Sequence, residues 1–358
     1  MCPGGTVRTV TSLIVGAGLD GRLGLSLDEL REVGVEAARL GFESLWTPAG
    51  GVPDAFHVCA RWSEATREMT SAGLRTGISV IPTARMWTVP ALAVQAATVG
   101  QISGGKFVLG LGTGGYGAAF WREVGLPDRP LAVMRDYVSV LRRLLAGETV
   151  THDGPAVRLQ KYGLGRPTPP VPVYLGALGP GMLRLAGECA DGVLLNWATP
   201  QAIAWSAERV AEGARSVDRA PSQVPIMMYI RVCIDQEIEI ARETFARQVL
   251  GYAMVRPGVD PSLGYRGHFG RMGFEEVLRD LEARRDRGAP IAELAAKVPE
   301  ELLQTVGYYG SSEGAAAAFR RLSEGLDEAV VRVITSRPGI ESVVVALQAL
   351  APAKVLAA

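Results

Sequence analysis

Residues 106–112 read Lys-Phe-Val-Leu-Gly-Leu-Gly and lead directly into Thr113-Gly114-Gly115. A short, almost wholly apolar run of this kind is typical of a parallel strand that is buried on both faces. Seven more such runs follow the same pattern: Thr9–Ala17, Ser44–Pro48, Leu74–Pro82, Val171–Gly176, Gly192–Ala198, Pro225–Ile234 and Ala329–Thr335. Longer amphipathic segments separate them. Eight strands alternating with helices predict an α/β protein with a (β/α)₈ TIM barrel.

Two of the intervening segments carry clear helix signals. Ser26 and Glu29 have the spacing of a capping box, so a helix is expected to begin there. After Pro130, apolar residues recur at three- and four-residue spacing until Gly147, which marks a helix end. Both segments are therefore predicted to be outer helices of the barrel.

Two stretches interrupt the regular alternation. Thr149–Pro170 is rich in glycine and proline, and the second stretch covers about residues 252–310. They precede the fifth and the eighth strand, and a chain of 358 residues is ordinary for one barrel with insertions. We therefore expect a single domain over residues 1–358. The second insertion contains helical pieces, Phe274–Arg285 and Pro290–Val298, and is expected to cover the barrel mouth.

Composition excludes several classes of function. Lys and Arg together number 37, as do Asp and Glu, so no net charge attracts nucleic acid or an anionic membrane. Four widely spaced cysteines and three isolated histidines form no metal motif, so no metal is expected. We find no leader and no apolar run of membrane-spanning length. These features predict a cytoplasmic protein with reduced thiols.

Two glycine clusters match the dinucleotide-binding fingerprint by their letters, namely residues 16–21 and 110–115. In a Rossmann fold the helix opens at the glycines. Here the first helix is delayed to Ser26, and Pro127 and Pro130 separate the second cluster from its helix. For the second cluster we favour a planar ligand lying against the backbone at a strand end, with plain tight-turn geometry as the alternative.

A third loop follows the fifth strand and runs through Ala177-Leu178-Gly179-Pro180, with a helix expected from about Gly181. Free backbone N–H groups at a helix start bind phosphate without basic side chains. The loop is therefore a candidate phosphate site. A short connection built only for packing is the alternative.

Taken together, these segments resemble the luciferase-like monooxygenase superfamily, and within it the oxidoreductases that use the deazaflavin coenzyme F-420. The resemblance covers most of the chain. It rests on Gly41–Trp46, Thr76–Val80, Pro90–Ala93 with Gln101–Gly114, Leu178–Pro180, Met182–Gly187 and Ala190–Gly192. It implies a (β/α)₈ barrel, a homodimer and bound coenzyme F-420, with FMN as the alternative cofactor.

The resemblance also assigns cofactor-binding residues. Family members often carry a non-proline cis peptide in the third strand that backs the middle ring of the deazaflavin, and Ser79-Val80 occupies that position. Gly112, Thr113 and Gly114 would contact the cofactor. The loop Ala177, Leu178, Gly179 and Pro180 would hold its phosphate through those backbone N–H groups that it has, since proline has none. The Gly-Pro form of this loop favours coenzyme F-420 over FMN.

The catalytic half of the family pattern is missing. Relatives often place an acid and a histidine after the second-strand tryptophan, whereas here Trp46-Thr47-Pro48 leads into Ala49-Gly50-Gly51. Sugar-phosphate dehydrogenases of the group carry a glutamate where this chain has Gly115, so that activity is not expected. His57 and Tyr116 remain candidate acid–base residues. The alternatives are a helix start for His57 and a pocket wall for Tyr116.

The substrate pocket is expected to be mostly apolar, which suits an uncharged, hydrophobic small molecule. Its predicted lining residues are Trp46, Thr47, Arg85, Trp87 and Trp197, with core packing as the alternative for Trp197. We expect hydride transfer between reduced coenzyme F-420 and a C=C, C=N or C=O bond. An FMN-dependent monooxygenase and a non-catalytic cofactor-binding protein are the alternatives.

Overall fold

The computed structural model describes residues 12–69, 74–82, 87–114, 125–257 and 259–358. Arg85 and Tyr116 therefore lie outside the described residues, as do residues 9–11 at the start of the first predicted strand.

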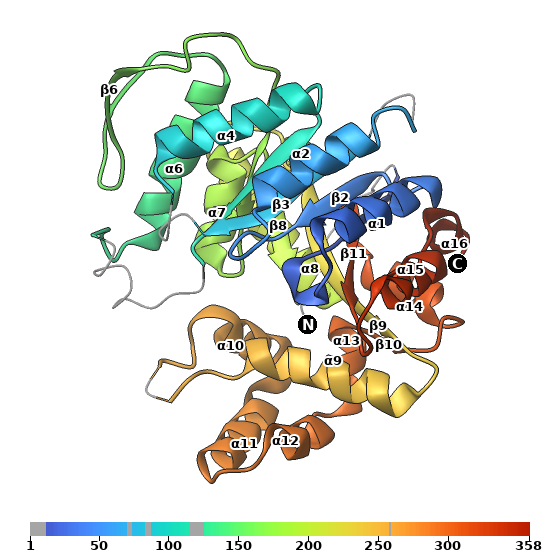
Figure 1. The fold of residues 1–358 in the computed structure, drawn as a ribbon. Helices are drawn as coiled ribbons and strands as arrows, with labels where there is room; N and C mark the ends of the chain where they lie inside the picture. The colour runs from blue at the N-terminus through green and yellow to red at the C-terminus, as the bar shows by residue number, and fades with distance from the viewer. Residues whose placement is uncertain (1–11, 70–73, 83–86, 115–124, 258) are drawn as a thin grey trace.

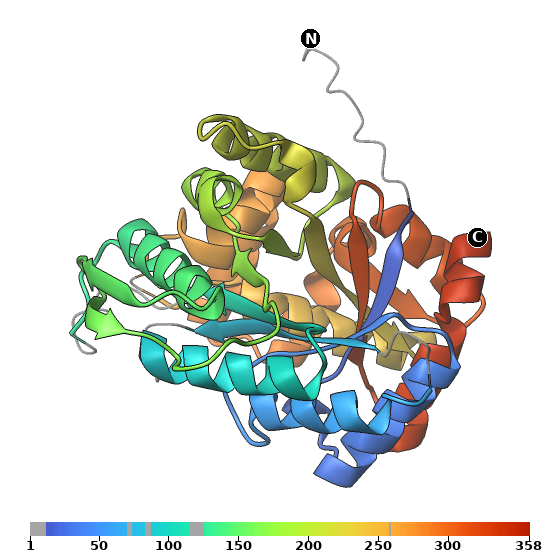
Figure 2. The same cartoon turned by 90° about the horizontal axis from the view of Figure 1, so that it is seen from above.

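Eight parallel strands close into a barrel, which confirms the predicted fold (Figures 1 and 2). Each of the eight apolar runs overlaps one of them: β1 (Ile14–Gly18), β2 (Ser44–Thr47), β3 (Arg75–Pro82), β4 (Phe107–Gly112), β7 (Val173–Gly176), β8 (Gly192–Asn196), β9 (Ile226–Ile234) and β11 (Glu328–Ile334). Strand β1 ends one residue after its predicted run, and β11 begins one residue before its run. Strands β8 and β9 pair, and β11 pairs with both β9 and β1, so the ring has no open edge.

Helices surround the strands, as the view from above shows (Figure 2). They are α1 (Leu27–Arg39), α2 (Ala55–Ala65), α4 (Val89–Ile102), α6 (Pro130–Leu145), α7 (Pro180–Cys189), α8 (Pro200–Arg215), α14 (Ala315–Leu322), α15 (Ile340–Ala349) and α16 (Pro352–Ala357), with short turns η1 (Gly21–Leu23) and η2 (Pro221–Gln223). The predicted capping box is present: Glu29 N donates to Ser26 Oγ at 3.2 Å, and Ser26 N donates to Glu29 Oε2 at 2.7 Å.

Both predicted insertions are present. The first holds an antiparallel hairpin, β5 (Val150–Asp153) and β6 (Arg158–Tyr162). The second follows β9 and begins earlier than the predicted residue 252, because it includes α9 (Ile238–Ala253). It also contains α10 (Gly264–Phe269), the π-helix η3 (Gly270–Phe274), α11 (Glu275–Asp286), α12 (Ile291–Lys297), α13 (Glu300–Val306) and β10 (Gly307–Gly310). Figure 1 shows the helices α9 to α13 together on one side of the barrel. We call these helices the helical insertion.

Strand β10 was not predicted. It pairs in parallel with the second half of β9, outside the ring of eight. Its sequence, Gly-Tyr-Tyr-Gly, is only four residues long and carries no run of apolar residues, so periodicity does not reveal it.

Besides the main core between strands and outer helices, two smaller hydrophobic clusters are present. Inside the barrel, Trp46, Val108, Tyr174, Leu194, Met227, Tyr229 and Val330 form one buried cluster. The helical insertion has its own cluster, which includes Phe245, Phe269 and Leu278 and reaches the barrel at Trp197. The barrel interior and the helical insertion are therefore packed as separate clusters, which approach each other at Trp197.

The carboxyl-terminal segment Ile340–Ala357 is apolar and long enough, by length and composition, to cross a membrane. The prediction that no segment meets this criterion was wrong. In the structure the segment folds as α15 and α16, and Val343, Leu347 and Val355 are fully buried. A core helix meets the same criterion, so the finding is weak evidence for a span.

Candidate active site

The predicted bulge lies in β3. The Ser79–Val80 peptide bond is cis, and the register of β3 against β4 shifts between Ile78 and Ile81. The Val80 side chain packs over two glycines of the neighbouring strands. A Cβ atom on Gly112 would lie 2.6 Å from Val80 Cγ2, and one on Gly176 would lie 3.2 Å from Val80 Cγ1. The glycines of β4 and β7 thus leave the space that the bulge fills.

The glycine loop continues from this bulge. Gly112 ends β4, Thr113 is half-buried, and Gly114 is exposed with φ at +81°, a conformation that favours glycine. The loop thus presents backbone rather than bulky side chains beside Val80.

The candidate phosphate loop joins β7 to α7. Gly179 is the N-cap residue of α7, with extended backbone and no side-chain cap, and Pro180 is the first helical residue. A Cβ atom on Gly179 would meet nothing within 4 Å. No side chain of the N-cap residue therefore accepts hydrogen bonds from the first N–H groups of α7, and the space beside Gly179 is open. A helix start that binds phosphate needs both features.

A basic residue of the helical insertion reaches this loop. Arg271 donates from Nη2 to the carbonyl oxygen of Leu178 at 3.3 Å, and burial lowers the pKa of its guanidinium. The sequence analysis missed Arg271, because only the fold brings η3 next to the loop after β7.

The predicted pocket residues near β2 are mostly occupied with packing. Trp46 is fully buried in the barrel, and its Nε1 donates to Glu328 Oε1 at 2.8 Å. Thr47 is buried as well. Trp87 is half-buried and meets the Phe56 ring edge-on, with 5.4 Å between the ring centroids. Their roles in a substrate pocket stay predictions.

His57 lies in the first turn of α2 with 78% of its side chain exposed, and its Nδ1 is 2.8 Å from Asp54 Oδ1. Asp54 also accepts hydrogen bonds from the backbone amides of Phe56 and His57, so it caps the helix. The helix start considered for His57 is confirmed, and its catalytic role remains a prediction.

Trp197 follows β8 and connects the barrel to the helical insertion. It is 1% exposed and adopts a φ of +53°, which is uncommon for a residue other than glycine. Tyr252 and Phe269 of the helical insertion pack against its ring. This packing matches the core role considered for Trp197, and its role in a substrate pocket stays a prediction.

The sequence analysis missed two buried arginines at the mouth. Arg231 of β9 and Arg332 of β11 are register partners, and each is 3% exposed. Each comes two residues after a member of the inner barrel cluster, Tyr229 and Val330 respectively, so both arginines face the interior. Burial lowers the pKa of both guanidiniums. The sequence did carry a signal for them, because each is an arginine within an otherwise mostly apolar strand segment.

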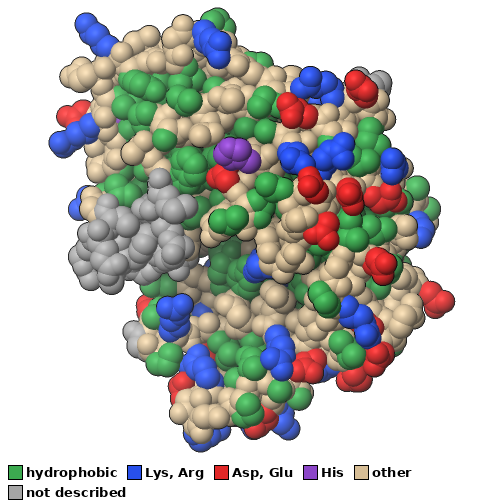
Figure 3. All heavy atoms as spheres, viewed as in Figure 1, with side chains coloured by type: hydrophobic (Ala, Val, Ile, Leu, Met, Phe, Trp, Pro, Cys, Tyr) green, Lys and Arg blue, Asp and Glu red, His purple; other side chains and the backbone are tan. Residues whose placement is uncertain are grey.

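The mouth is therefore more strongly charged than predicted. Arg332 forms an ion pair with Asp20, a buried residue just after β1. Arg231 donates from Nη1 to Asn196 Oδ1 at 2.6 Å. The surface is hollowed between the barrel and the helical insertion, with hydrophobic and basic side chains visible inside (Figure 3).

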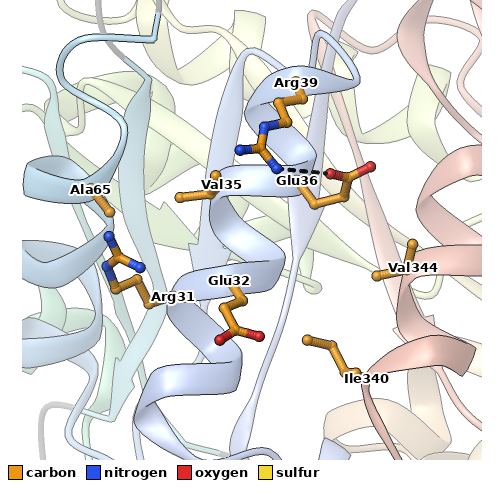
Figure 4. Close-up of a pocket in the computed structure, with 8 residues that line it drawn as sticks. All are labelled: Arg31, Glu32, Val35, Glu36, Arg39, Ala65, Ile340 and Val344. Atoms are coloured by element: carbon orange, nitrogen blue, oxygen red, sulfur yellow. Dashed lines mark ion pairs between the residues drawn. The ribbon is translucent and has the colours of Figure 1, made fainter.

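A second depression lies elsewhere, on the outer wall (Figure 4). It is an open groove between α1, α2 and α15, and an ion pair of Glu36 and Arg39, both on α1, lies along one wall at 3.7 Å. Its lining residues are Arg31, Glu32, Val35, Glu36, Arg39, Ala65, Ile340 and Val344. None of them is a predicted site residue, and they belong to outer helices rather than to strand ends. Among the described residues, no group of side chains suited to a metal was found.

Comparisons with known proteins agree with this architecture. The family model described as luciferase-like monooxygenase matches residues 9–328. The chain is similar to 5,10-methylenetetrahydromethanopterin reductase of Methanolobus tindarius, with 29% identity over 69% of this chain and 73% of that protein. It is also similar to F420-dependent glucose-6-phosphate dehydrogenase of Nakamurella multipartita, with 30% identity over 60% of this chain and 66% of that protein.

Among solved structures, the coenzyme F420-dependent tetrahydromethanopterin reductase of Methanopyrus kandleri superimposes with a TM-score of 0.76. The alignment covers 96% of this chain and 99% of the other, at 19% identity. At that identity the match shows that the two chains share their fold.

Proposed function

The chain belongs to the luciferase-like monooxygenase family, and from this premise we propose that it is an oxidoreductase that binds coenzyme F420 and exchanges a hydride with a small organic molecule. The observation that carries the proposal is the junction of β3, β4 and β7, where Val80 packs over Gly112 and Gly176. This junction lies at the strand ends, where barrel enzymes bind their ligands.

The loops around this junction fit the two ends of a deazaflavin cofactor. Ser79, Val80, Gly112, Thr113 and Gly114 would border its ring system, because the strands there expose backbone beside a small, apolar surface. The loop Ala177–Pro180 would hold its phosphate, since the start of α7 is uncapped and open. The Ala177 N–H already donates to the Leu194 carbonyl oxygen at 3.1 Å and Pro180 has no N–H, so Leu178, Gly179 and the residues after Pro180 would supply the donors. Two relatives named for F420, one similar in sequence and one in fold, support this cofactor over FMN.

When bound, the reduced cofactor supplies a hydride to a C=C, C=N or C=O bond. The protein itself orients the reactants and excludes water. The packed aromatic rings of Trp197, Tyr252 and Tyr265 supply an apolar wall between barrel and helical insertion. His57 and Tyr116 remain the proposed proton donors, with solvent as the other source.

We further propose that the substrate has a hydrophobic body and that residues 1–358 form one barrel domain with two insertions. A cytoplasmic homodimer completes the proposal. The closed ring of eight strands supports a single barrel domain. The resemblance to dimeric family members supports the dimer, and the molar mass in solution tests it.

The decisive experiment is titration of the purified protein with coenzyme F420 and, separately, with FMN, followed by intrinsic tryptophan fluorescence. We expect saturable quenching by coenzyme F420 and binding of FMN that is weaker by at least ~tenfold. Oxygen-dependent turnover with reduced FMN would instead support a monooxygenase. Tight cofactor binding without consumption of any acceptor would indicate a non-catalytic protein, and failure of both cofactors to bind would refute the proposal.

A further inference from the structure

Two buried positive charges meet at the barrel mouth. Arg231 and Arg332 lie opposite each other in the register of β9 and β11. Each is 3% exposed. A buried guanidinium keeps its charge, so each must be balanced by an anion or by well-placed acceptors.

The described residues balance only one of the two charges. Asp20 is the buried acid at this position, and it pairs with Arg332 and, at 2.8 Å, with the half-exposed Arg22. Arg231 has an amide and aromatic rings as neighbours: Nη1 donates to Asn196, and the guanidinium carbon lies 3.9 Å from the centroid of the Trp197 ring. Within the described parts of the chain, no carboxylate lies at ion-pair distance from Arg231. One positive charge is left over.

Unused hydrogen-bond donors surround these arginines. Arg332 Nη1, Tyr229 Oη and Trp197 Nε1 are buried and form no hydrogen bond. The Arg332 guanidinium lies over the Tyr229 ring at 5.2 Å, and Trp197 lies against Arg231. Because Arg231 and Arg332 are register partners, the two pairs are neighbours. Buried donors are almost always paired in folded proteins. Three unpaired ones beside an unbalanced charge indicate a missing acceptor that carries negative charge.

This place adjoins the proposed cofactor site. Val80 packs against the inner barrel cluster that contains Tyr229. Gly18 of β1 leaves room for the same ring, because a Cβ atom there would lie 2.8 Å from Tyr229 Cε1. A ligand group that bridges Tyr229 and the two arginines would therefore extend toward the bulge at Ser79–Val80.

We propose that the substrate carries a carboxylate, and that Arg231, Arg332 and Tyr229 bind this group at the ends of β9 and β11. A carboxylate has the single negative charge that the cluster lacks and the acceptor oxygens that its donors need. A phosphate dianion would leave an excess of negative charge. The role of the site in a reaction rests on the function proposed above, whereas carboxylate binding can be measured without it.

The test uses benzoate as the probe, with benzamide as its uncharged isostere and phenyl phosphate as the dianion. Each is titrated into the full-length protein, with and without coenzyme F420, and tryptophan fluorescence is recorded because Trp197 lies in the cluster. We expect benzoate to bind at least ~tenfold more tightly than benzamide, as for a charged hydrogen bond, and more tightly than phenyl phosphate.

The critical variant is Arg231→Met, which removes the charge but leaves no carboxylate unpaired. We expect its benzoate affinity to fall at least ~tenfold, while its affinity for coenzyme F420 stays unchanged. Arg219→Met is the matched control. Like Arg231, the Arg219 guanidinium donates hydrogen bonds to neutral groups, namely the carbonyl oxygens of Gly187, Ala190 and Gln223. Its removal should leave benzoate binding intact.

Equal binding of benzoate and benzamide by the unaltered protein would overturn the proposal without any variant. Tighter binding of phenyl phosphate would overturn the carboxylate assignment. A loss of coenzyme F420 affinity in Arg231→Met would show that the arginines serve the cofactor instead. If benzoate binds and neither cofactor does, the proposed function fails and this inference stands. If coenzyme F420 binds and benzoate does not, this inference fails and the proposed function stands.

Discussion

The Nε2 atom of His268 lies 2.9 Å from the carbonyl oxygen of Trp197. This contact joins α10 of the helical insertion to the end of β8, at the residue whose φ is +53°. Burial lowers the pKa of His268 to about 4. The imidazole is therefore neutral near pH 7, with its Nε2–H donating to the carbonyl group.

The first prediction concerns acid. The ordinary pKa of histidine, 6.5, applies to the unfolded chain, and the folded pKa is about 4. Between these values the unfolded state binds a proton that the folded state excludes, so stability falls as pH falls through this window. The free energy of unfolding should decrease by up to ~3 kcal/mol across this window, and it should not change through this group above pH 6.5. Urea unfolding from pH 7.5 to 4.5 should show it.

The variant His268→Gln should unfold with less dependence on pH, because Gln can donate to Trp197 without titrating. His57→Gln is the control, since His57 is mostly exposed. An identical pH dependence in the original protein and in His268→Gln would contradict the prediction.

The second prediction tests the phosphate loop. Gly179→Asp should fold normally, because Asp is a favoured N-cap residue and the position is open. It should weaken coenzyme F420 binding by at least ~tenfold, since its carboxylate occupies the helix start and repels phosphate. Gly179→Ala adds bulk without charge and should bind the cofactor as the original protein does. Unchanged affinity in Gly179→Asp would refute this placement of the phosphate.

The third prediction concerns the bulge. In Gly112→Ala the new methyl group would lie 2.6 Å from Val80 Cγ2, so Val80 must move. We expect a loss of ~1–3 kcal/mol in the free energy of unfolding and weaker binding of coenzyme F420. Gly251→Ala, in α9 with open space around it, should instead stabilise the protein slightly. Equal behaviour of the two variants in thermal unfolding and cofactor titration would argue against a tight junction at Val80.

The fourth prediction separates binding from folding at Tyr229. Tyr229→Phe removes a buried hydroxyl that has no partner, so stability should change by less than ~1 kcal/mol. Benzoate affinity should fall, because one proposed donor is lost. In Tyr137→Phe the hydroxyl that donates to the Trp87 carbonyl at 3.1 Å disappears, and stability should fall by ~1 kcal/mol. Calorimetry of both variants measures the difference in stability, and titration measures their affinity for benzoate. Unaltered benzoate binding in Tyr229→Phe would show that Tyr229 is not part of the site.

Local signals in the sequence were sufficient for the barrel. Each of the eight strands is an apolar run of its own, and the capping box at Ser26 depends on residues three positions apart. The bulge at Ser79–Val80 was predicted as well, from the family resemblance rather than from propensity. The strands and the cap are determined within short segments, so one sequence suffices to predict them, whereas the bulge also required the resemblance to a family.

The charged part of the mouth depends on longer distances. Arg231 and Arg332 are separated by about one hundred residues, and only the register of β9 with β11 brings them together. Arg271 likewise approaches Leu178 only after the helical insertion has packed. In a hydropathy pattern these arginines are single charged residues within apolar or amphipathic segments, so the pattern does not show that they lie together. Their joint role appears only once the inward faces of the strands are known.

Strand β10 returns the chain to the strand from which the helical insertion departed. Gly307–Gly310 pair with Arg231–Ile234, just before α9 begins. The start and the end of the helical insertion are thus hydrogen-bonded to each other at the end of β9. A change in the length or sequence of the segment between them would therefore leave the hydrogen bonds that close the ring of eight strands in place.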